Sequence, residues 1–151
     1  MMDASRSRAE LQALAAFFGK AARPPANWTI EADAPGGILR SVTFGVASQS
    51  GKRYTIYVPL GGFPHSVPPV YIKSPRPLRD RAGNPLTSVS ASMHVLSPDS
   101  DGSTQICHFP PSQWDQYTSL VKIIPRILMW LHIYEQHLKT GRPIDQYLDH
   151  G

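Results

Sequence analysis

The sequence predicts an α+β fold in which an N-terminal helix, a four-stranded antiparallel meander and a long helix follow one another. Two patterns support this prediction. Apolar residues recur at helical spacing near both ends of the chain, whereas short runs in the middle alternate apolar and polar residues, as half-buried strands do. The connections between these runs are too short for parallel crossovers, so the strands are expected to be antiparallel.

The first expected helix covers residues 3–19, with Asp3 or Ser5 as its cap and Gly19 as its stop. Residues 22–25, Ala-Arg-Pro-Pro, are expected to form an extended linker, because a proline disfavours helical conformation in the residue before it. The four expected strands cover residues 28–32, 38–47, 52–60 and 70–74.

The closing helix is expected to start near Thr118, a good N-cap, and to end at Gly141. Its apolar residues form a continuous stripe, which we interpret as core. Pro125 lies about two turns into this helix, so it must either kink the helix or mark a second start with proline in the first turn.

Composition and charge exclude several classes of protein. The content of 41% apolar and 17% charged residues fits one folded domain over residues 1–151. The single cysteine excludes an internal disulfide and a Cys-rich zinc site, and it suits a reducing cytoplasm, where we expect the protein. No apolar run reaches the roughly 18–20 residues of a membrane span.

The net charge of +4 is modest, and its basic residues are not arranged as a nucleic-acid surface. The densest basic cluster is interpreted as a solvated loop face, with an acidic protein surface or phosphate as the alternative partner. It consists of Lys73, Arg76, Arg79 and Arg81. We therefore expect no nucleic acid, no membrane, no cofactor and no metal ion as partners.

Two irregular segments carry the specific signals. Residues 97–114 read SPDSDGSTQICHFPPSQW and hold the only cysteine, Cys107, between the expected sheet and the closing helix. Residues 61–69 read GGFPHSVPP and predict a rigid corner. Because proline cannot donate to a strand ladder, the Pro-Pro pair must lie at the start or edge of the next strand.

These motifs resemble the ubiquitin-conjugating enzyme family over residues 3–138. That family places an aromatic-Pro and a Pro-Pro pair after its third strand, and the matching residues are Phe63, Pro64, Pro68 and Pro69. In the family a His-Pro-Asn triplet precedes the catalytic cysteine by ten residues, and here Ser97-Pro98-Asp99 stands ten residues before Cys107. Trp114 follows Cys107 by seven residues, close to the position of the family's tryptophan.

The resemblance narrows to bacterial, stand-alone relatives of these enzymes. Those relatives lack the standard triplet and the two usual C-terminal helices, and residues 130–151 resemble their ends. The chain is therefore similar to the short-form conjugating proteins of cyclic-oligonucleotide anti-phage (CBASS) systems. The fold that this resemblance implies is ubiquitin-conjugating-enzyme-like, without the two usual C-terminal helices.

The resemblance also implies a reaction. Cys107 would receive an acyl group as a thioester and pass it to an amine. The donor would be the C-terminus of a ubiquitin-like protein or of a CBASS nucleotidyltransferase. Because the chain has no Gly-rich nucleotide loop, activation with ATP would belong to a separate activating enzyme.

The altered triplet leaves the roles of the other site residues open. An ionised Asp99 cannot donate a hydrogen bond to an oxyanion, the role that the resemblance assigns to the triplet's Asn. Asp99 would then orient or deprotonate the incoming amine. Alternatively, the donor would be a backbone N–H near Gly102 or the side chain of His94 or His108. His94 lies thirteen residues before Cys107, so it reaches the site only if the segment between them folds back. The third reading is an inactive protein.

Two further functions fit the same residues. A catalytically inactive conjugating-enzyme variant that only binds partners would explain the altered triplet, and a lone cysteine is often a small buried hydrophobe. A Cys-His hydrolase would need a base positioned by the fold, and the sequence contains no local signature for one.

Overall fold

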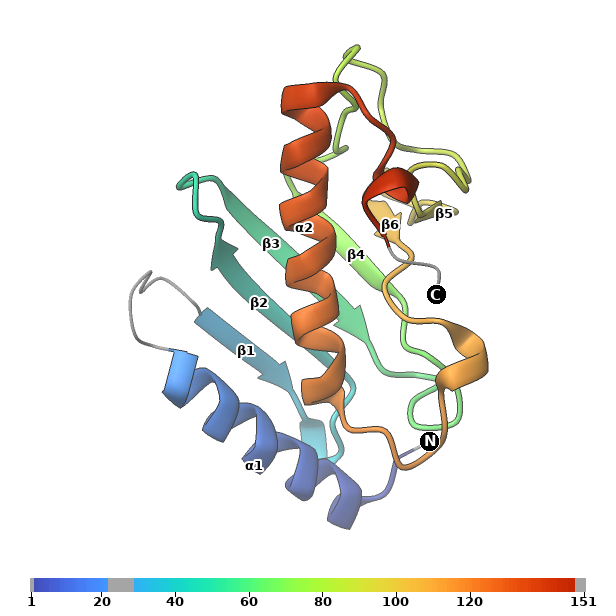
Figure 1. Cartoon of the computed structure of the whole chain (residues 1–151). Coiled ribbons are helices and arrows are strands. Elements are labelled where there is room, and N and C mark those ends of the chain that lie inside the picture. The colour runs from blue at the N-terminus through green and yellow to red at the C-terminus, as the bar shows by residue number, and fades with distance from the viewer. Residues whose placement is uncertain (1, 22–28, 149–151) are drawn as a thin grey trace.

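A six-stranded antiparallel sheet forms the centre of the structure, a computed structural model that describes residues 2–21 and 29–148 (Figure 1). Its strands lie in the order β1-β2-β3-β4-β6-β5. They are β1 (Thr29–Asp33), β2 (Ser41–Ala47), β3 (Arg53–Pro59), β4 (Val70–Ser74), β5 (Val95–Leu96) and β6 (Thr104–Ile106). The first four form the predicted meander, and the last two add a hairpin that the sequence periodicity does not predict.

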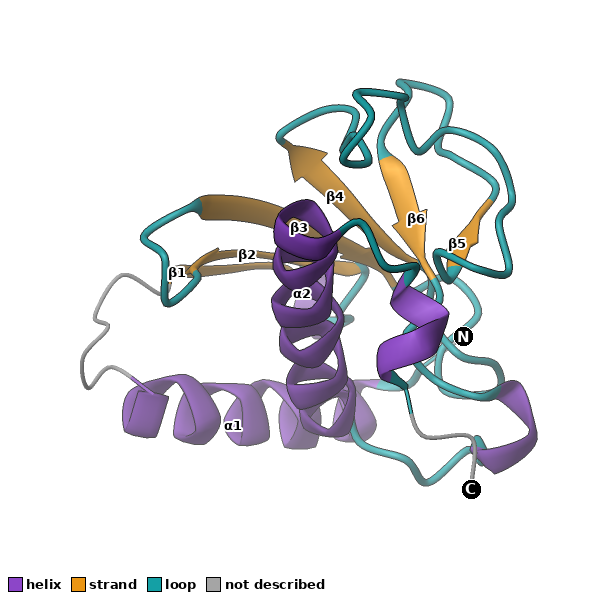
Figure 2. Cartoon of the chain, turned by 45° about the horizontal axis from the view of Figure 1, so that its top comes forward, coloured by secondary structure: helices purple, strands orange, loops and turns teal. Residues whose placement is uncertain are grey.

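Two long helices accompany the sheet, α1 (Ala4–Ala21) and α2 (Ile123–Thr140). α2 lies across one face of the sheet (Figure 1, Figure 2). α1 contacts β1 and η3 (Leu120–Lys122), the short 3₁₀ helix that leads into α2. Three further 3₁₀ helices are η1 (Pro35–Gly37), η2 (Pro111–Gln113) and η4 (Ile144–Tyr147). Within residues 2–21 and 29–148, every helix is too short or too polar to span a membrane.

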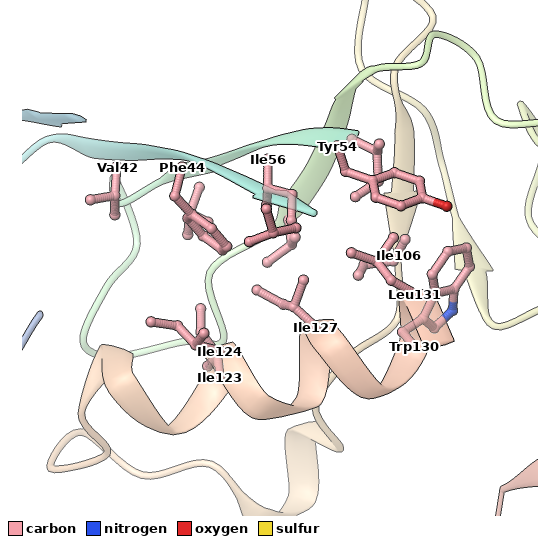
Figure 3. Close-up of a cluster of buried hydrophobic side chains, with 14 of the residues drawn as sticks. Val42, Phe44, Tyr54, Ile56, Ile106, Ile123, Ile124, Ile127, Trp130 and Leu131 are labelled. Carbon is pink, nitrogen blue, oxygen red and sulfur yellow. The ribbon is translucent and has the colours of Figure 1, made fainter. Parts of the chain in front are cut away.

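The core lies between the sheet and α2, because every second residue of β2 and β3 is buried. Side chains from the two layers point toward one another (Figure 3). The sheet contributes Val42, Phe44, Tyr54, Ile56 and Ile106, and α2 contributes Ile123, Ile124, Ile127, Trp130 and Leu131. The predicted alternation and the predicted apolar stripe are therefore the two halves of one core.

The ends of α1 agree only in part with the prediction. Asp3 caps the helix, since its Oδ1 accepts the N–H of Arg6 at 2.7 Å. The prediction that Gly19 stops the helix is wrong, because α1 continues to Ala21. Glycine is a permitted stop rather than an obligatory one, and its cost of about 1 kcal/mol in a helix is tolerated near an end. The expected linker at 22–25 lies outside the described residues.

α2 begins later than predicted. The prediction that Thr118 caps α2 is wrong, because Lys122 is at the N-cap position of α2 and its side chain makes no capping bond. Ser119 caps the preceding η3, where its Oγ accepts the N–H of Val121 at 3.4 Å. Pro125 is the third residue of α2, where a backbone N–H has no intrahelical acceptor, so the helix starts around this proline. Gly141 ends α2 as predicted, with a φ of 78° and its N–H bonded to the carbonyl of His137.

The layered core yields a stability prediction. Ile127→Ala should lower the free energy of unfolding by about 2–5 kcal/mol, because it empties a fully buried position beneath the sheet. Met129→Ala is the matched control on the same helix, since the Met129 side chain is 56% exposed and should change stability by about 0.5 kcal/mol or less. Urea unfolding measures both, and equal losses would contradict the placement of the core.

Candidate active site

Cys107 follows β6 directly and continues the pairing of the β5–β6 hairpin by one residue. Its N–H donates to the carbonyl of His94 at 2.8 Å, next to the pair formed by Val95 and Ile106. The hairpin therefore brings Cys107 and His94 together, across a loop that separates them in the sequence, and both residues line one hollow of the surface.

The thiol lies where two hollows of the surface meet. One hollow, of about 340 Å³, is lined by residues that include His94, Arg126, Met129, Trp130 and Leu148. The other, of about 230 Å³, is bounded by Val67, Pro68, Pro69, Leu96, Gln105, Ile106 and Pro111. Cys107, His108 and Phe109 line both. The half-buried Cys107 thus borders two hollows.

The surroundings of Cys107 do not activate the thiol by charge. Burial raises its pKa above the ordinary value, because the thiolate loses hydration. No hydrogen bond to its sulfur is formed by any described residue. The thiol form therefore predominates at neutral pH, and a reaction at this sulfur needs a group that removes the proton.

His108 is buried and holds the chain against the proline-rich corner. Its Nε2 lies 3.0 Å from the carbonyl of Pro68, so Nε2 carries the proton and donates. Burial is the largest cause that lowers the pKa of His108 to about 4, because the charged ring would lose its hydration. Among the described residues nothing bonds to its Nδ1. His108 is therefore a neutral packing residue beside the thiol.

His94 is held from three directions. Its carbonyl accepts the N–H of Cys107 and also the indole N–H of Trp130, at 3.1 Å. Its ring Nε2 lies 2.7 Å from a carboxylate oxygen of Asp145, in η4. The residue has a φ of 50°, a left-handed conformation uncommon outside glycine.

Asp99, expected to act on the incoming amine, lies at the other end of the hairpin from Cys107. Its N–H bonds to the carbonyl of Ser103, and about 13 Å of strand separates Ser103 from Cys107. Its carboxylate accepts from Lys73 at 2.7 Å, and this hydrogen bond is the main reason why its pKa is lowered. Gly102, whose N–H bonds to the carbonyl of Asp99, belongs to the same distant turn.

The predicted basic cluster is partly paired rather than solvated. Lys73 of β4 contacts both Asp99 and Asp101, at 2.7 and 3.0 Å, and Arg76 contacts Asp101 at 3.2 Å. The Lys73 ammonium also lies 5.3 Å from the ring of Tyr57 and equally far from that of Tyr71. These contacts fix the turn of the hairpin to the sheet.

The aromatic-Pro corner packs against Trp114. The indole N–H donates to the carbonyl of Pro64 at 2.9 Å, and the ring meets those of Phe63 and Phe109 edge-on. The guanidinium of Arg126 lies 4.6 Å from the ring of Phe109. The motif residues that are separated in the sequence therefore form one support for the segment after Cys107.

Three residues at the site had no local signal in the sequence. Arg126 and Trp130 lie on a helix whose pattern indicates only core, and Asp145 is 51 positions away from His94. No group of three or more His, Cys, Asp or Glu side chains that could hold a metal ion is present in residues 2–21 and 29–148.

Comparison with known protein families gives one match. A family model described as Type II CBASS E2 protein matches residues 30–145 of the chain. The matched region contains Cys107, His94, all of α2 and, at its end, Asp145. Curated proteins and solved structures gave no match.

The buried His108 predicts a specific loss of stability in acid. Because its pKa falls from an ordinary 6.5 to about 4, the unfolded chain binds a proton in this range that the folded chain does not. The contribution of the neutral His108 to the free energy of unfolding is present above pH 6.5 and is lost as pH falls toward 4.

The matched variant is His108→Gln, whose Nε2 can keep the bond to the Pro68 carbonyl but cannot titrate. Urea unfolding at pH 7 and 4.5 should show the wild type losing about 2–3 kcal/mol more than this variant, since one pKa unit is about 1.4 kcal/mol. The same pH dependence in both proteins would contradict a neutral, buried His108.

Proposed function

Because the chain belongs to the Type II CBASS E2 protein family, we propose that Cys107 receives an acyl group as a thioester and passes it to an amine. Membership of the family gives a conjugating-type transferase role in anti-phage defence, together with partner proteins of the CBASS system. The thioester and the residue that carries it are the finer part of the proposal.

The observation that carries the proposal is the place of Cys107 at the meeting point of two hollows. An acyl carrier must meet two substrates in turn, a donor and an amine. Cys107 lines both hollows, and in the proposed reaction the acyl group occupies one of them while the amine approaches through the other. A cysteine buried only for packing would not need two approaches.

The reaction is balanced as two acyl transfers. In the first, the Cys107 sulfur attacks the carbonyl carbon of the donor C-terminus, which the separate activating enzyme presents as a thioester. The C–S bond to the activating enzyme breaks, and its leaving thiolate takes up the proton of Cys107. In the second, the amine attacks the Cys107 thioester, the C–S bond breaks, and an amide forms. The amine gives up a proton and the thiol of Cys107 is restored.

The donor that suits this role is a protein C-terminus, either of a ubiquitin-like protein or of a CBASS nucleotidyltransferase. Activation with ATP falls to a separate enzyme. We further propose that the described elements form one ubiquitin-conjugating-enzyme-like domain in which the β5–β6 hairpin carries the cysteine.

A second candidate function is a binding module that has the same fold but no chemistry. The observation that favours it is the raised pKa of the Cys107 thiol, together with the distance of Asp99 from that thiol. Such a module would bind the CBASS partners without forming a covalent adduct.

The two candidates differ in a gel assay. We expect the chain, incubated with the donor and activating proteins of a CBASS system and ATP, to form an adduct on a non-reducing gel. Neutral hydroxylamine should cleave this adduct, whereas the phosphine reductant TCEP should leave it intact, which distinguishes a thioester from a disulfide. Because Cys107 is the only cysteine, Cys107→Ala should abolish the adduct completely.

The contrary results are equally specific. An adduct that persists in Cys107→Ala contradicts the proposed nucleophile. Retention of the donor protein on the immobilised chain without any adduct would favour the binding module.

A further inference from the structure

We propose that Asp145 is a positioning residue that orients the His94 imidazole so that His94 takes the proton of Cys107 during acyl transfer. The segment that follows α2 then forms part of the active site. This inference rests on the proposed function and adds to it a residue that neither the altered triplet nor the cysteine segment indicates.

The backbone places His94 within reach of the thiol. The N–H of Cys107 donates to the carbonyl of His94 at 2.8 Å, so the two residues are neighbours at the end of the β5–β6 hairpin. Both side chains line the same hollow. In a structure without substrate, hydrogen bonds between catalytic groups are often long and shorten only when substrate is present.

The contact with Asp145 defines the chemistry of the His94 ring. The carboxylate lies 2.7 Å from Nε2, and an ionised carboxylate only accepts hydrogen bonds. Nε2 therefore carries the ring proton, which leaves Nδ1 as the nitrogen that accepts. The same carboxylate stabilises the imidazolium that forms when the ring takes up a second proton.

Asp145 can act in this way because its own position is fixed by the fold. Its N–H donates to the carbonyl of Ser92 at 2.8 Å, so Asp145 contacts the segment before β5 through both its backbone and its side chain. The preceding residue, Ile144, is fully buried. At the start of the segment, Nδ1 of His137 lies 2.7 Å from the carbonyl of Arg142. Both views show η4 beside the β5–β6 hairpin (Figure 1, Figure 2).

The other titratable groups around His94 do not serve the same purpose. Among the described residues that line this hollow they are Cys107 and His108 from the segment after β6, and Arg126 from α2. His108 uses its ring N–H for a backbone carbonyl and stays neutral. Arg126 is permanently charged and accepts no proton. His94, with Asp145 behind it, is the remaining base.

The proton transfers balance in both steps. When the Cys107 sulfur attacks the donor thioester, its proton moves to Nδ1 of His94, and the imidazolium returns it to the donor's leaving thiolate. In the second step the imidazole takes a proton from the attacking amine and gives it to the departing Cys107 sulfur. No oxidant, reductant or metal ion is required.

The test uses a small donor, because the proton transfer involves only the thiol and the histidine. A synthetic peptide with a C-terminal glycine thioester of mercaptoethanesulfonate is mixed with the full chain, and the acylated protein is followed by intact mass spectrometry. At pH 7 we expect Asp145→Asn to slow acylation about ten- to a hundredfold. This loss is a part of the roughly 10²- to 10⁴-fold rate increase that a positioned base contributes. Asp145→Glu should recover most of the rate.

The pH profile distinguishes positioning from a loss of structure. Near pH 10 hydroxide forms the thiolate without a base, so wild type and Asp145→Asn should differ by less than about threefold. His94→Gln should match Asp145→Asn, and the double variant should be no slower than either. The control is Gln146→Ala, an exposed neighbour in the same 3₁₀ helix, which should react like the wild type at both pH values.

Two results would overturn the inference. One is an Asp145→Asn variant that matches the wild type at pH 7, and the other is an equal loss of rate at pH 7 and pH 10. Neither result depends on the gel assay with CBASS partners. Absence of the adduct in that assay, combined with the expected peptide kinetics, would instead contradict the proposed function.

Discussion

The site depends on one hydrogen-bond acceptor, the backbone carbonyl of His94. It accepts the N–H of Cys107 at 2.8 Å and the indole N–H of Trp130 at 3.1 Å, so the start of the β5–β6 hairpin, the cysteine and α2 meet at one atom. The left-handed conformation of His94 is uncommon for a residue with a Cβ, and these contacts over-determine it. Because Trp130 belongs to the buried face of α2, the position of the thiol follows from the packing of the core.

The β5–β6 hairpin is held at its two ends by different forces. At the cysteine end, the contacts are hydrogen bonds to the backbone, apolar packing and the pair formed by His94 and Asp145. At the turn, Asp99 and Asp101 pair with Lys73 of β4, at a surface where such pairs are screened by water. Ser97-Pro98-Asp99 therefore serves the turn of the hairpin, away from the end that holds His94 and Cys107.

The electrostatics of the site suit a carrier that reacts only when a substrate and a base are both present. Burial keeps Cys107 in its thiol form, which reacts slowly on its own. The neutral His108 supports the chain beside it without changing this charge state. Cys107 borders two hollows, and the proposed proton acceptor, His94, is held by Asp145 from a separate part of the chain.

The sequence alone determined the meander and the end of α2 at Gly141, because these depend on local periodicity and on glycine, and its single cysteine leaves Cys107 as the proposed nucleophile. Its resemblance to the short-form conjugating proteins agrees with the family match. Strands of two and three residues are too short for periodicity, so the β5–β6 hairpin could not be predicted. Only the tertiary structure shows that Asp99 lies away from Cys107 and that Asp145 contacts His94. A contact across 51 positions is decided by how α2 and the segment after it pack against the sheet.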